Sequence, residues 1–273
     1  MGQNLKGVRG VDQFKIVCIC QVYNELLKDN LKRFIKYLNP LVDDFVFYDD
    51  GSTDGSYEYL LDHTPHVIRG DENDFVNERK HKQLMLEKAL RLNPDFILWL
   101  DADEILTANA ETRLQKLCGY CEENNLDGIS LQEVNIWRSH SWKRVDSGYN
   151  NGIFVRLWRV TPDLRYDSLE PGLHQKPYPS SITEIQTIWD VKVLHYGFSS
   201  KKRLAYKYLT YKAHGQQGYY MLDRLISEER LMLKKVPKHY FPEGLWIDDD
   251  PPQPLSFEES LAYVEEYKKS WVE

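Results

Sequence analysis

Two aspartates separated by one residue stand directly after a run of apolar residues in the segment DFILWLDADEIL, residues 95–106. On an extended backbone Asp101 and Asp103 would point the same way, with side chains roughly 7 Å apart. Two carboxylates at that spacing suit a hard divalent cation, Mg²⁺ or Mn²⁺, and Ala102 between them leaves room for a ligand close to the backbone. Such a metal would neutralise a diphosphate and stabilise it as a leaving group.

Polar or acidic residues also follow two other apolar runs. The run 14–20 leads into the segment 22–25, and the run 44–50 leads into the turn DDGSTD, residues 49–54. In open α/β sheets, ligands bind at the carboxyl ends of parallel strands, and these ends share one edge of the sheet. We therefore expect the three polar segments to meet at one site, each held by a rigid strand.

The elements that would position these acids alternate along the first hundred residues. This order indicates a mainly parallel sheet with right-handed crossovers and flanking helices. Strands are expected at 14–20, 44–50, 66–69 and 95–100, and helices at about 26–38, 54–61 and 74–91.

The pattern changes after about residue 125, where longer strand-like runs are joined by irregular loops. Ser256 followed by Glu259 fits a capping box, which predicts the start of a last helix. We expect strands at 128–137, 152–160 and 187–198, and helices at 201–220, 222–233 and 256–271. The prediction is therefore an α/β domain over 1–200 followed by a helical C-terminal extension over 201–273.

The composition is that of a globular protein, with 42% hydrophobic residues and a formal net charge of −7 in 273 residues. A net acidic chain is a poor partner for nucleic acid. No apolar run approaches the ~20 residues that span a bilayer, and no secretory leader is apparent. We expect a soluble, cytoplasmic protein; a peripheral contact with a membrane and the oligomeric state stay open.

The four cysteines form two closely spaced pairs, Cys18 with Cys20 and Cys118 with Cys121. Together they could close a tetrahedral zinc site. The favoured interpretation is that all four are small buried hydrophobes in a reducing compartment.

The strings VYNE, DDFVFYDDGSTDGS and DFILWLDADEIL, taken in order, resemble the family 2 glycosyltransferases with the GT-A fold. The similarity covers roughly 14–200 and is clearest over 14–106. The pairing of DDGSTD with DAD about fifty residues later carries the specificity. The resemblance implies a Rossmann-like nucleotide-binding half at about 14–106, an acceptor half at about 107–200, and a mixed second part of the sheet.

That resemblance also implies a function: metal-dependent transfer of a sugar from a nucleotide-diphosphate sugar, with a UDP-sugar as the expected donor. The acceptor would be a hydroxyl of a carbohydrate or another compound, and the transfer would invert the anomeric carbon. Two alternatives stay open. One is a non-catalytic carbohydrate- or nucleotide-binding protein, and the other a sugar-phosphate nucleotidyltransferase, although QVYNELLKDN lacks the glycine-rich loop of that class.

The resemblance assigns roles to single residues. Asp50 would accept from the base, and Arg79 or Lys80, before DAD, would help hold the nucleotide. Asp103 would ligate Mn²⁺ or Mg²⁺, and His195 in VLHYGF would complete the metal site together with Asp101. The implied nucleotide contacts are Val22, Tyr23, Glu25, Asp50, Arg79, Asp101 and Ala102.

Ordinary structural roles compete with these assignments. Asp50 can cap a turn, Arg79 can be a solvated helix charge, and His195 can be a core imidazole.

An inverting transfer needs a carboxylate that takes the proton of the acceptor hydroxyl. The best stretch for it is DSLEPGLHQ, residues 167–175, in which Glu170 precedes a Pro-Gly turn and His174 follows. Many relatives carry a His-Glu pair where this chain has His174-Gln175, and glutamine cannot act as a base. Glu170 is the favoured base; Asp167, or a weakly catalytic chain, is the alternative.

Overall fold

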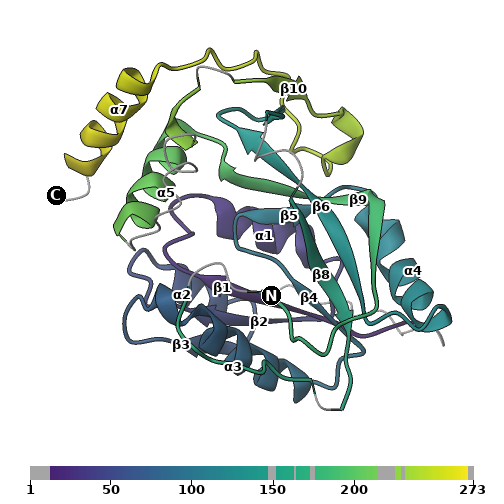
Figure 1. Ribbon diagram of the computed structural model, residues 1–273. Helices are drawn as coiled ribbons and strands as arrows, with labels where there is room; N and C mark the ends of the chain where they lie inside the picture. The colour runs from purple at the N-terminus through teal and green to yellow at the C-terminus, as the bar shows by residue number, and fades with distance from the viewer. Residues whose placement is uncertain are drawn as a thin grey trace.

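The computed structural model describes residues 13–146, 152–162, 164–172, 176–213, 225–228 and 231–269. A twisted sheet runs through the centre, with α3 on one side and α1 and α4 on the other (Figure 1). The strand order is β10-β7-β6-β8-β4-β1-β2-β3, and β9 pairs with both β5 and β6. This mixed α/β architecture confirms the predicted fold class.

The first half is the parallel part of the sheet. Strand β1 pairs in parallel with β2 and with β4, and β2 pairs in parallel with β3. Its elements are β1 (Ile16–Val22), α1 (Asn30–Leu38), β2 (Asp44–Asp49), α2 (Ser56–Leu61), β3 (Val67–Arg69), η1 (Phe75–Asn77), α3 (Glu78–Leu90) and β4 (Phe96–Trp99). The register places Val22 opposite Asp49, so the two strands end side by side.

Alternate residues of β1 enter two cores, because successive strand side chains point to opposite faces. Ile16 and Cys18 pack with Phe34 of α1 on one face. Val17 and Ile19 form the opposite core with the buried side of α3. All four cysteines are free and buried in the first of these cores, which confirms their interpretation as small hydrophobes.

The second half adds longer strands and antiparallel pairs. Strand β8 joins β4 to β6 by antiparallel pairing on both sides, whereas β6 and β9 run parallel. The elements are β5 (Glu104–Leu106), α4 (Ala110–Glu123), β6 (Gly128–Trp137), β7 (Trp142–Arg144), β8 (Ile153–Arg159) and β9 (Ile185–Phe198). Strand β5 follows DAD at once and pairs with β9, which brings Glu104 opposite His195.

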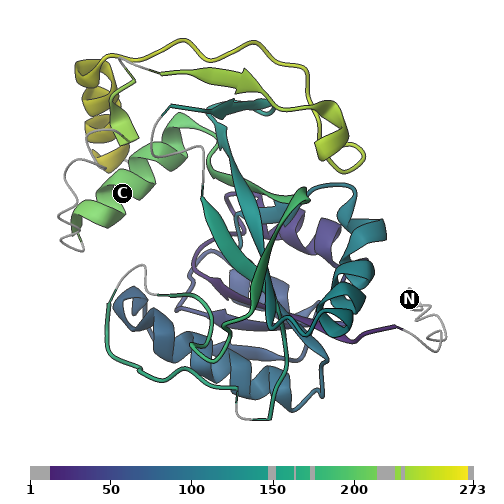
Figure 2. The same cartoon turned by 45° about the vertical axis from the view of Figure 1, so that its right-hand side comes forward.

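The C-terminal part packs back onto the sheet. Helix α5 (Lys201–Ala213) and helix α7 (Phe257–Lys269) lie side by side, as both views show (Figures 1 and 2). The predicted capping box is confirmed, because the amide of Glu259 donates to the hydroxyl of Ser256 (3.1 Å) and the amide of Ser256 donates back to Glu259 (2.8 Å).

The prediction of a helix through to Leu233 is wrong at its end. Leu233–Lys235 forms β10, which pairs antiparallel with β7, and a short 3-10 turn η2 (Lys238–Tyr240) follows. Because its strand partner comes from residues 142–144, the segment could not be recognised from local helical spacing. Within the described ranges, no helix has both the length and the apolar character needed to cross a membrane.

Candidate functional site

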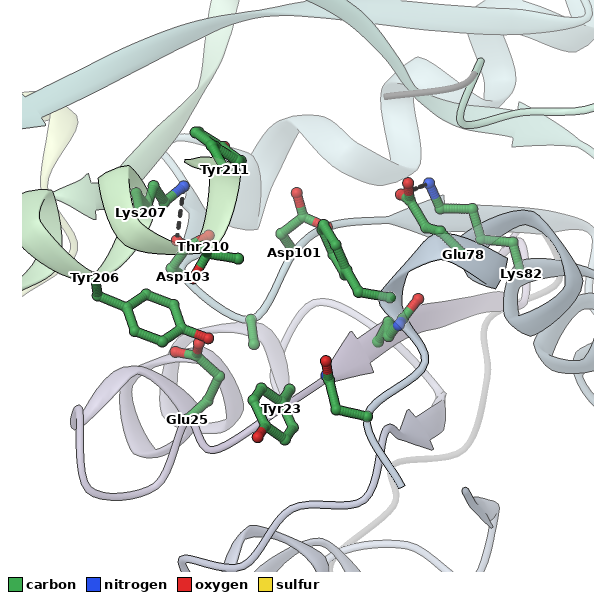
Figure 3. Close-up of a pocket in the computed structure, with 14 residues that line it drawn as sticks. Tyr23, Glu25, Glu78, Lys82, Asp101, Asp103, Tyr206, Lys207, Thr210 and Tyr211 are labelled. Atoms are coloured by element: carbon green, nitrogen blue, oxygen red, sulfur yellow. Dashed lines mark hydrogen bonds and ion pairs between the residues drawn. The ribbon is translucent and has the colours of Figure 1, made fainter. Parts of the chain in front are cut away.

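The polar ends of β1 and β4 meet in a pocket of about 210 Å³. Tyr23 and Glu25 come from the loop after β1, and Asp101, Ala102 and Asp103 come from the turn after β4. Figure 3 shows these residues between α3, which contributes Glu78 and Lys82, and α5, which contributes Tyr206, Lys207, Thr210 and Tyr211. The predicted convergence is therefore observed for the ends of β1 and β4, with a helix from the C-terminal part opposite them, whereas no residue of the predicted segment 49–54 lines the pocket.

Asp50 directly follows β2 and is fully buried, outside the set of residues that line the pocket. Its carboxylate accepts from the amide of Asp74 (3.0 Å), from Asn73 Nδ2 (3.0 Å) and from Gln21 Nε2 (3.2 Å). Burial raises the pKa of Asp50 to about 6, against these hydrogen bonds, which lower it. Asn73 and Gln21 both line the pocket, so Asp50 is hydrogen-bonded to two residues that a ligand in the pocket could contact.

Gly51 allows this arrangement. Its φ of +75° belongs to the left-handed region that favours glycine, and an added Cβ would lie 2.7 Å from the backbone of Glu72. The close approach brings the segment 72–74 against the end of β2. The glycine in DDGSTD therefore holds Asn73 within reach of Asp50.

Asp101 is the open carboxylate of the pocket. Within the described ranges, no hydrogen bond or ion pair engages its side chain, which lines the pocket (Figure 3). Its backbone is fixed, because the amide of Asp101 donates to Glu104 Oε2 (2.9 Å) while Glu104 Oε1 accepts from the buried Arg156 (2.5 Å). Burial raises the pKa of Asp101, against the nearby charge of Arg156, which lowers it.

Asp103 is in the opposite situation, surrounded by cations. Its Oδ2 atom lies 3.0 Å from Nη2 of Arg203 and 3.4 Å from Nζ of Lys207, both on α5. Burial alone would raise the pKa of Asp103, but Lys207, His195 and Arg203 hold it well below its ordinary value. This ion pair fastens α5 to the turn after β4 (Figure 3).

His195 lies behind Asp103 on β9, buried and outside the set of residues that line the pocket. Its Nδ1 is 2.6 Å from Oδ1 of Asn135, and its Nε2 is 3.1 Å from Nζ of Lys207 and 3.5 Å from Oδ2 of Asp103. Gly197 makes room for these contacts, because an added Cβ would lie 2.3 Å from the ring and 2.4 Å from Nζ of Lys207.

The fit of a metal ion differs among the three predicted ligands. The two carboxylates offer the oxygen donors that Mg²⁺ and Mn²⁺ prefer, and Asp101 is open to the pocket. Both ring nitrogens of His195 are already engaged, so the imidazole could bind a metal only after Lys207 moves away. In the described part of the chain, no group of three or more His, Cys, Asp or Glu side chains is arranged to hold a metal ion.

Other predicted residues lie outside the pocket. The Val22 side chain is buried in the core, and its carbonyl accepts from the amide of Asp50 (2.8 Å). Arg79 donates to the carbonyl of Ser168 (3.3 Å). Glu170 is exposed on the loop that contains Ser168.

That loop runs close to η1, because the amide of Gly172 donates to the carbonyl of Val76 (2.8 Å). His174, with Gln175, lies outside the described residues.

The residues that sequence reasoning missed come mainly from α5. Arg203 and Lys207 are four residues apart and so face the same way, which is the one signal in the sequence that could have found them. On the other side, Lys82 lines the pocket, forms an ion pair with Glu78 and lies over the Trp99 ring, 4.5 Å from its centre.

Residues 17–162 match the family model described as glycosyl transferase family 2. The chain belongs to this family. The match spans more than half of the chain and includes every strand end that builds the pocket. No curated protein matches the chain.

Solved structures of TarS from S. aureus are similar in fold to this family 2 glycosyltransferase. The structure of TarS 1–349 has 15% sequence identity and a TM-score of 0.47, covering 78% of this chain and 70% of that one. TarS 1–349 in complex with UDP has 16% identity and a TM-score of 0.47 over the same shares. The complex with UDP-GlcNAc has 15% identity and a TM-score of 0.46, covering 78% and 71%.

Proposed function

We propose that this chain transfers a sugar from a nucleotide-diphosphate sugar to a hydroxyl of a carbohydrate or another acceptor. The observation that carries the proposal is the pocket itself, in which the polar strand ends of a family 2 glycosyltransferase face cationic side chains. A nucleotide sugar needs a polar contact for its base and positive charge for its diphosphate. The pocket offers both.

The base would lie near Tyr23 and Asn73, where Asp50 orders the surrounding amide groups. The diphosphate would then lie between Asp101 and the ammonium group of Lys207. On α3 we assign the basic contact to Lys82, which lines the pocket, while Arg79 as a nucleotide contact stays a prediction. A uridine base also stays a prediction from the resemblance of the sequence.

A divalent ion, Mn²⁺ or Mg²⁺, would be held by Asp101 and Asp103 together with the diphosphate. When bound, it would supply positive charge to the leaving diphosphate. Asp101 supports this proposal because its carboxylate is open to the pocket and its backbone is fixed by Glu104. Lys207 and Arg203 already neutralise Asp103 from the other side, so they would share the charge of the bound donor.

The transfer step needs one proton acceptor. The acceptor oxygen forms a bond to the anomeric carbon as the bond from that carbon to the diphosphate oxygen breaks, and the hydroxyl proton passes to a carboxylate. Attack opposite the leaving group inverts the anomeric carbon. Glu170 is our candidate base, because its loop is attached to η1, whose Phe75 lines the pocket.

Two measurements test these assignments. Incubation with a panel of nucleotide sugars and Mn²⁺ should release the nucleoside diphosphate slowly, whereas release of pyrophosphate from a nucleoside triphosphate would indicate a nucleotidyltransferase instead. Glu170→Gln should remove transfer while nucleotide-sugar binding stays intact, and Asp167→Asn is the matched variant. If Asp167→Asn alone abolishes transfer, the assignment of the base to Glu170 is wrong.

A further inference from the structure

A second cavity, of about 620 Å³, lies beside the pocket of the candidate site, which we call the donor pocket because the nucleotide sugar is proposed to bind there. Asn24 lines it from the loop after β1, whereas the neighbouring Tyr23 and Glu25 line the donor pocket. Tyr206 of α5 lines both, so its ring forms part of the wall between them. The ammonium group of Lys28 lies 4.2 Å from the centre of that ring and 2.9 Å from Glu25, which closes the wall from the side of the second cavity.

The carboxylates in this cavity are already engaged. Asp54 Oδ2 accepts from the amides of Leu26 (3.0 Å) and Leu27 (3.1 Å), and Asp29 forms an ion pair with Lys32 (3.2 Å). The lining nevertheless holds four cationic side chains against these two carboxylates, which is an excess of positive charge. The charged side chains that line it are Lys28, Asp29, Arg33, Asp54, Lys202 and Arg203.

Two of these cations, Arg33 and Lys202, have no carboxylate partner in an ion pair within the described part of the chain. Arg33 stacks over the Tyr196 ring, 4.0 Å from its centre, and donates to Asn30 Oδ1 (2.9 Å), a neutral group. Within the described ranges, no carboxylate forms an ion pair with Arg33 or with the exposed Lys202. Burial and the nearby charge of Arg203 lower the pKa of Arg33, against the more distant carboxylates of Asp103 and Asp29, which raise it.

An independent observation comes from Tyr196, which also lines the cavity. The residue is only 4% exposed, and its hydroxyl has no hydrogen-bond partner in the described part of the chain. A buried hydroxyl without a partner costs free energy that a ligand can recover. The cavity thus combines an unsatisfied hydroxyl with unbalanced positive charge.

We propose that this cavity binds an anionic carbohydrate, a sugar that carries a phosphate or a carboxylate, as part of the acceptor. Arg33 and Lys202 receive the anionic group, and the rings of Tyr206 and Tyr267 pack against the sugar. The volume is of the size that encloses one or two sugar units. The role as acceptor subsite rests on the proposed glycosyltransferase function, and the shared wall at Tyr206 places the ligand next to the donor.

Calorimetry with defined probes tests the proposal: glucose 6-phosphate, glucuronate and neutral glucose, each titrated into the full chain. Both anionic sugars should bind at least about tenfold more tightly than glucose. The relative affinity of the phosphate and the carboxylate identifies the preferred acceptor group. Equal affinity for all three sugars would overturn the proposal.

Variants locate the binding. Arg33→Met should weaken capture of glucose 6-phosphate about tenfold, and Lys36→Met, three residues later on the same helix, exposed and outside the cavity, should change it less than twofold. Lys202→Met is the second variant, and because this side chain is exposed we expect the variant to fold like the wild-type chain. If Lys36→Met weakens binding as much as the other two variants, the ligand does not occupy this cavity.

Two further binding experiments distinguish this inference from binding to a membrane surface and from the proposed glycosyltransferase function. Capture of phosphatidylglycerol vesicles without any binding of glucose 6-phosphate would assign the cations to a membrane surface and overturn the inference. Titration of the wild-type chain with UDP tests the proposed function separately. Binding of UDP without the sugar phosphate contradicts only the acceptor subsite, and binding of the sugar phosphate without any nucleotide contradicts only the glycosyltransferase proposal.

Discussion

The two walls of the donor pocket differ in origin. One wall consists of strand ends, with Tyr23 after β1 and Asp101 after β4, and it is held by backbone pairing within the parallel sheet. The other wall is α5, which contributes Lys207 and is fastened to the first wall through Asp103. A pocket at the edge of a sheet can therefore be closed by a helix that is distant in the chain and is held there by an ion pair, here between Asp103 and Lys207.

The largest effect should follow from cutting that connection. Asp103→Asn removes the negative charge but leaves Arg203 and Lys207 close together, and loss of one partner from a largely buried ion pair costs about 3 kcal/mol. The free energy of unfolding, measured by denaturant titration, should fall by that amount. Asp71→Asn, at an exposed position, should change it by less than about 0.5 kcal/mol. Equal stability of the two variants would show that α5 is held by other contacts.

A second variant asks what the α5 wall does for the ligand. Lys207→Met should weaken binding of a nucleoside diphosphate by about 2 kcal/mol, because a charge-assisted contact to the diphosphate is lost. Binding of the nucleoside without phosphates should stay unchanged. Lys212→Met, on the exposed side of the same helix, is the control. Calorimetry that finds equal losses for nucleoside and diphosphate would place Lys207 away from the phosphates.

A pH experiment examines the strand-end wall. The pKa of Asp50 in the folded chain is raised to about 6 by burial, above its value in the unfolded chain, so the folded state binds more protons between about pH 4 and 6. The contribution of Asp50 to stability is therefore largest below this window and is lost as the pH rises through 6. Relative to Asp50→Asn, the wild-type chain should lose about 1 kcal/mol of unfolding free energy between pH 4.5 and 7. Parallel pH profiles for the two proteins would contradict the raised pKa.

The smallest effect is expected on α3, where two basic residues can be compared. Arg79→Met should alter the affinity for a nucleoside diphosphate less than twofold, about 0.4 kcal/mol, because Arg79 contacts the carbonyl of Ser168 outside the pocket. Lys82→Met should have a larger effect, because Lys82 lines the pocket. The reverse order would restore Arg79 to the role that its place in the sequence predicts.

The contrast between the walls also explains what the sequence could predict. Asp50 and Asp101 follow apolar runs, and the carboxyl ends of parallel strands meet at one edge, so their convergence needed no tertiary detail. Lys207 reaches the pocket only because α5 packs against α7 and pairs with Asp103, contacts between segments some fifty and one hundred residues apart in the chain. Strand β10 could not be predicted for the same reason, because its partner strand β7 lies some ninety residues earlier in the chain.

The spacing alone also could not predict which of the two aspartates is open to the pocket and which forms ion pairs. Asp101 and Asp103 are equivalent in the DAD motif, yet one is open to the pocket and the other is paired with two cations. The difference arises from α5, whose Arg203 and Lys207 contact only Asp103 of the two acids, and Gly197 leaves space for Lys207 beside His195. Spacing predicted two carboxylates in one place, and only the packing of α5 shows that they are not alike.

The central claim is that the open carboxylate of Asp101 helps to bind a nucleoside diphosphate through a divalent ion. The most direct test is calorimetric titration of UDP into the wild-type chain and into Asp101→Asn, each with Mn²⁺ and with the metal chelated. We predict that Mn²⁺ tightens binding to the wild-type chain at least about tenfold and has little effect on Asp101→Asn. Equal affinity of the wild-type chain with and without Mn²⁺, or no binding of UDP at all, would contradict the account.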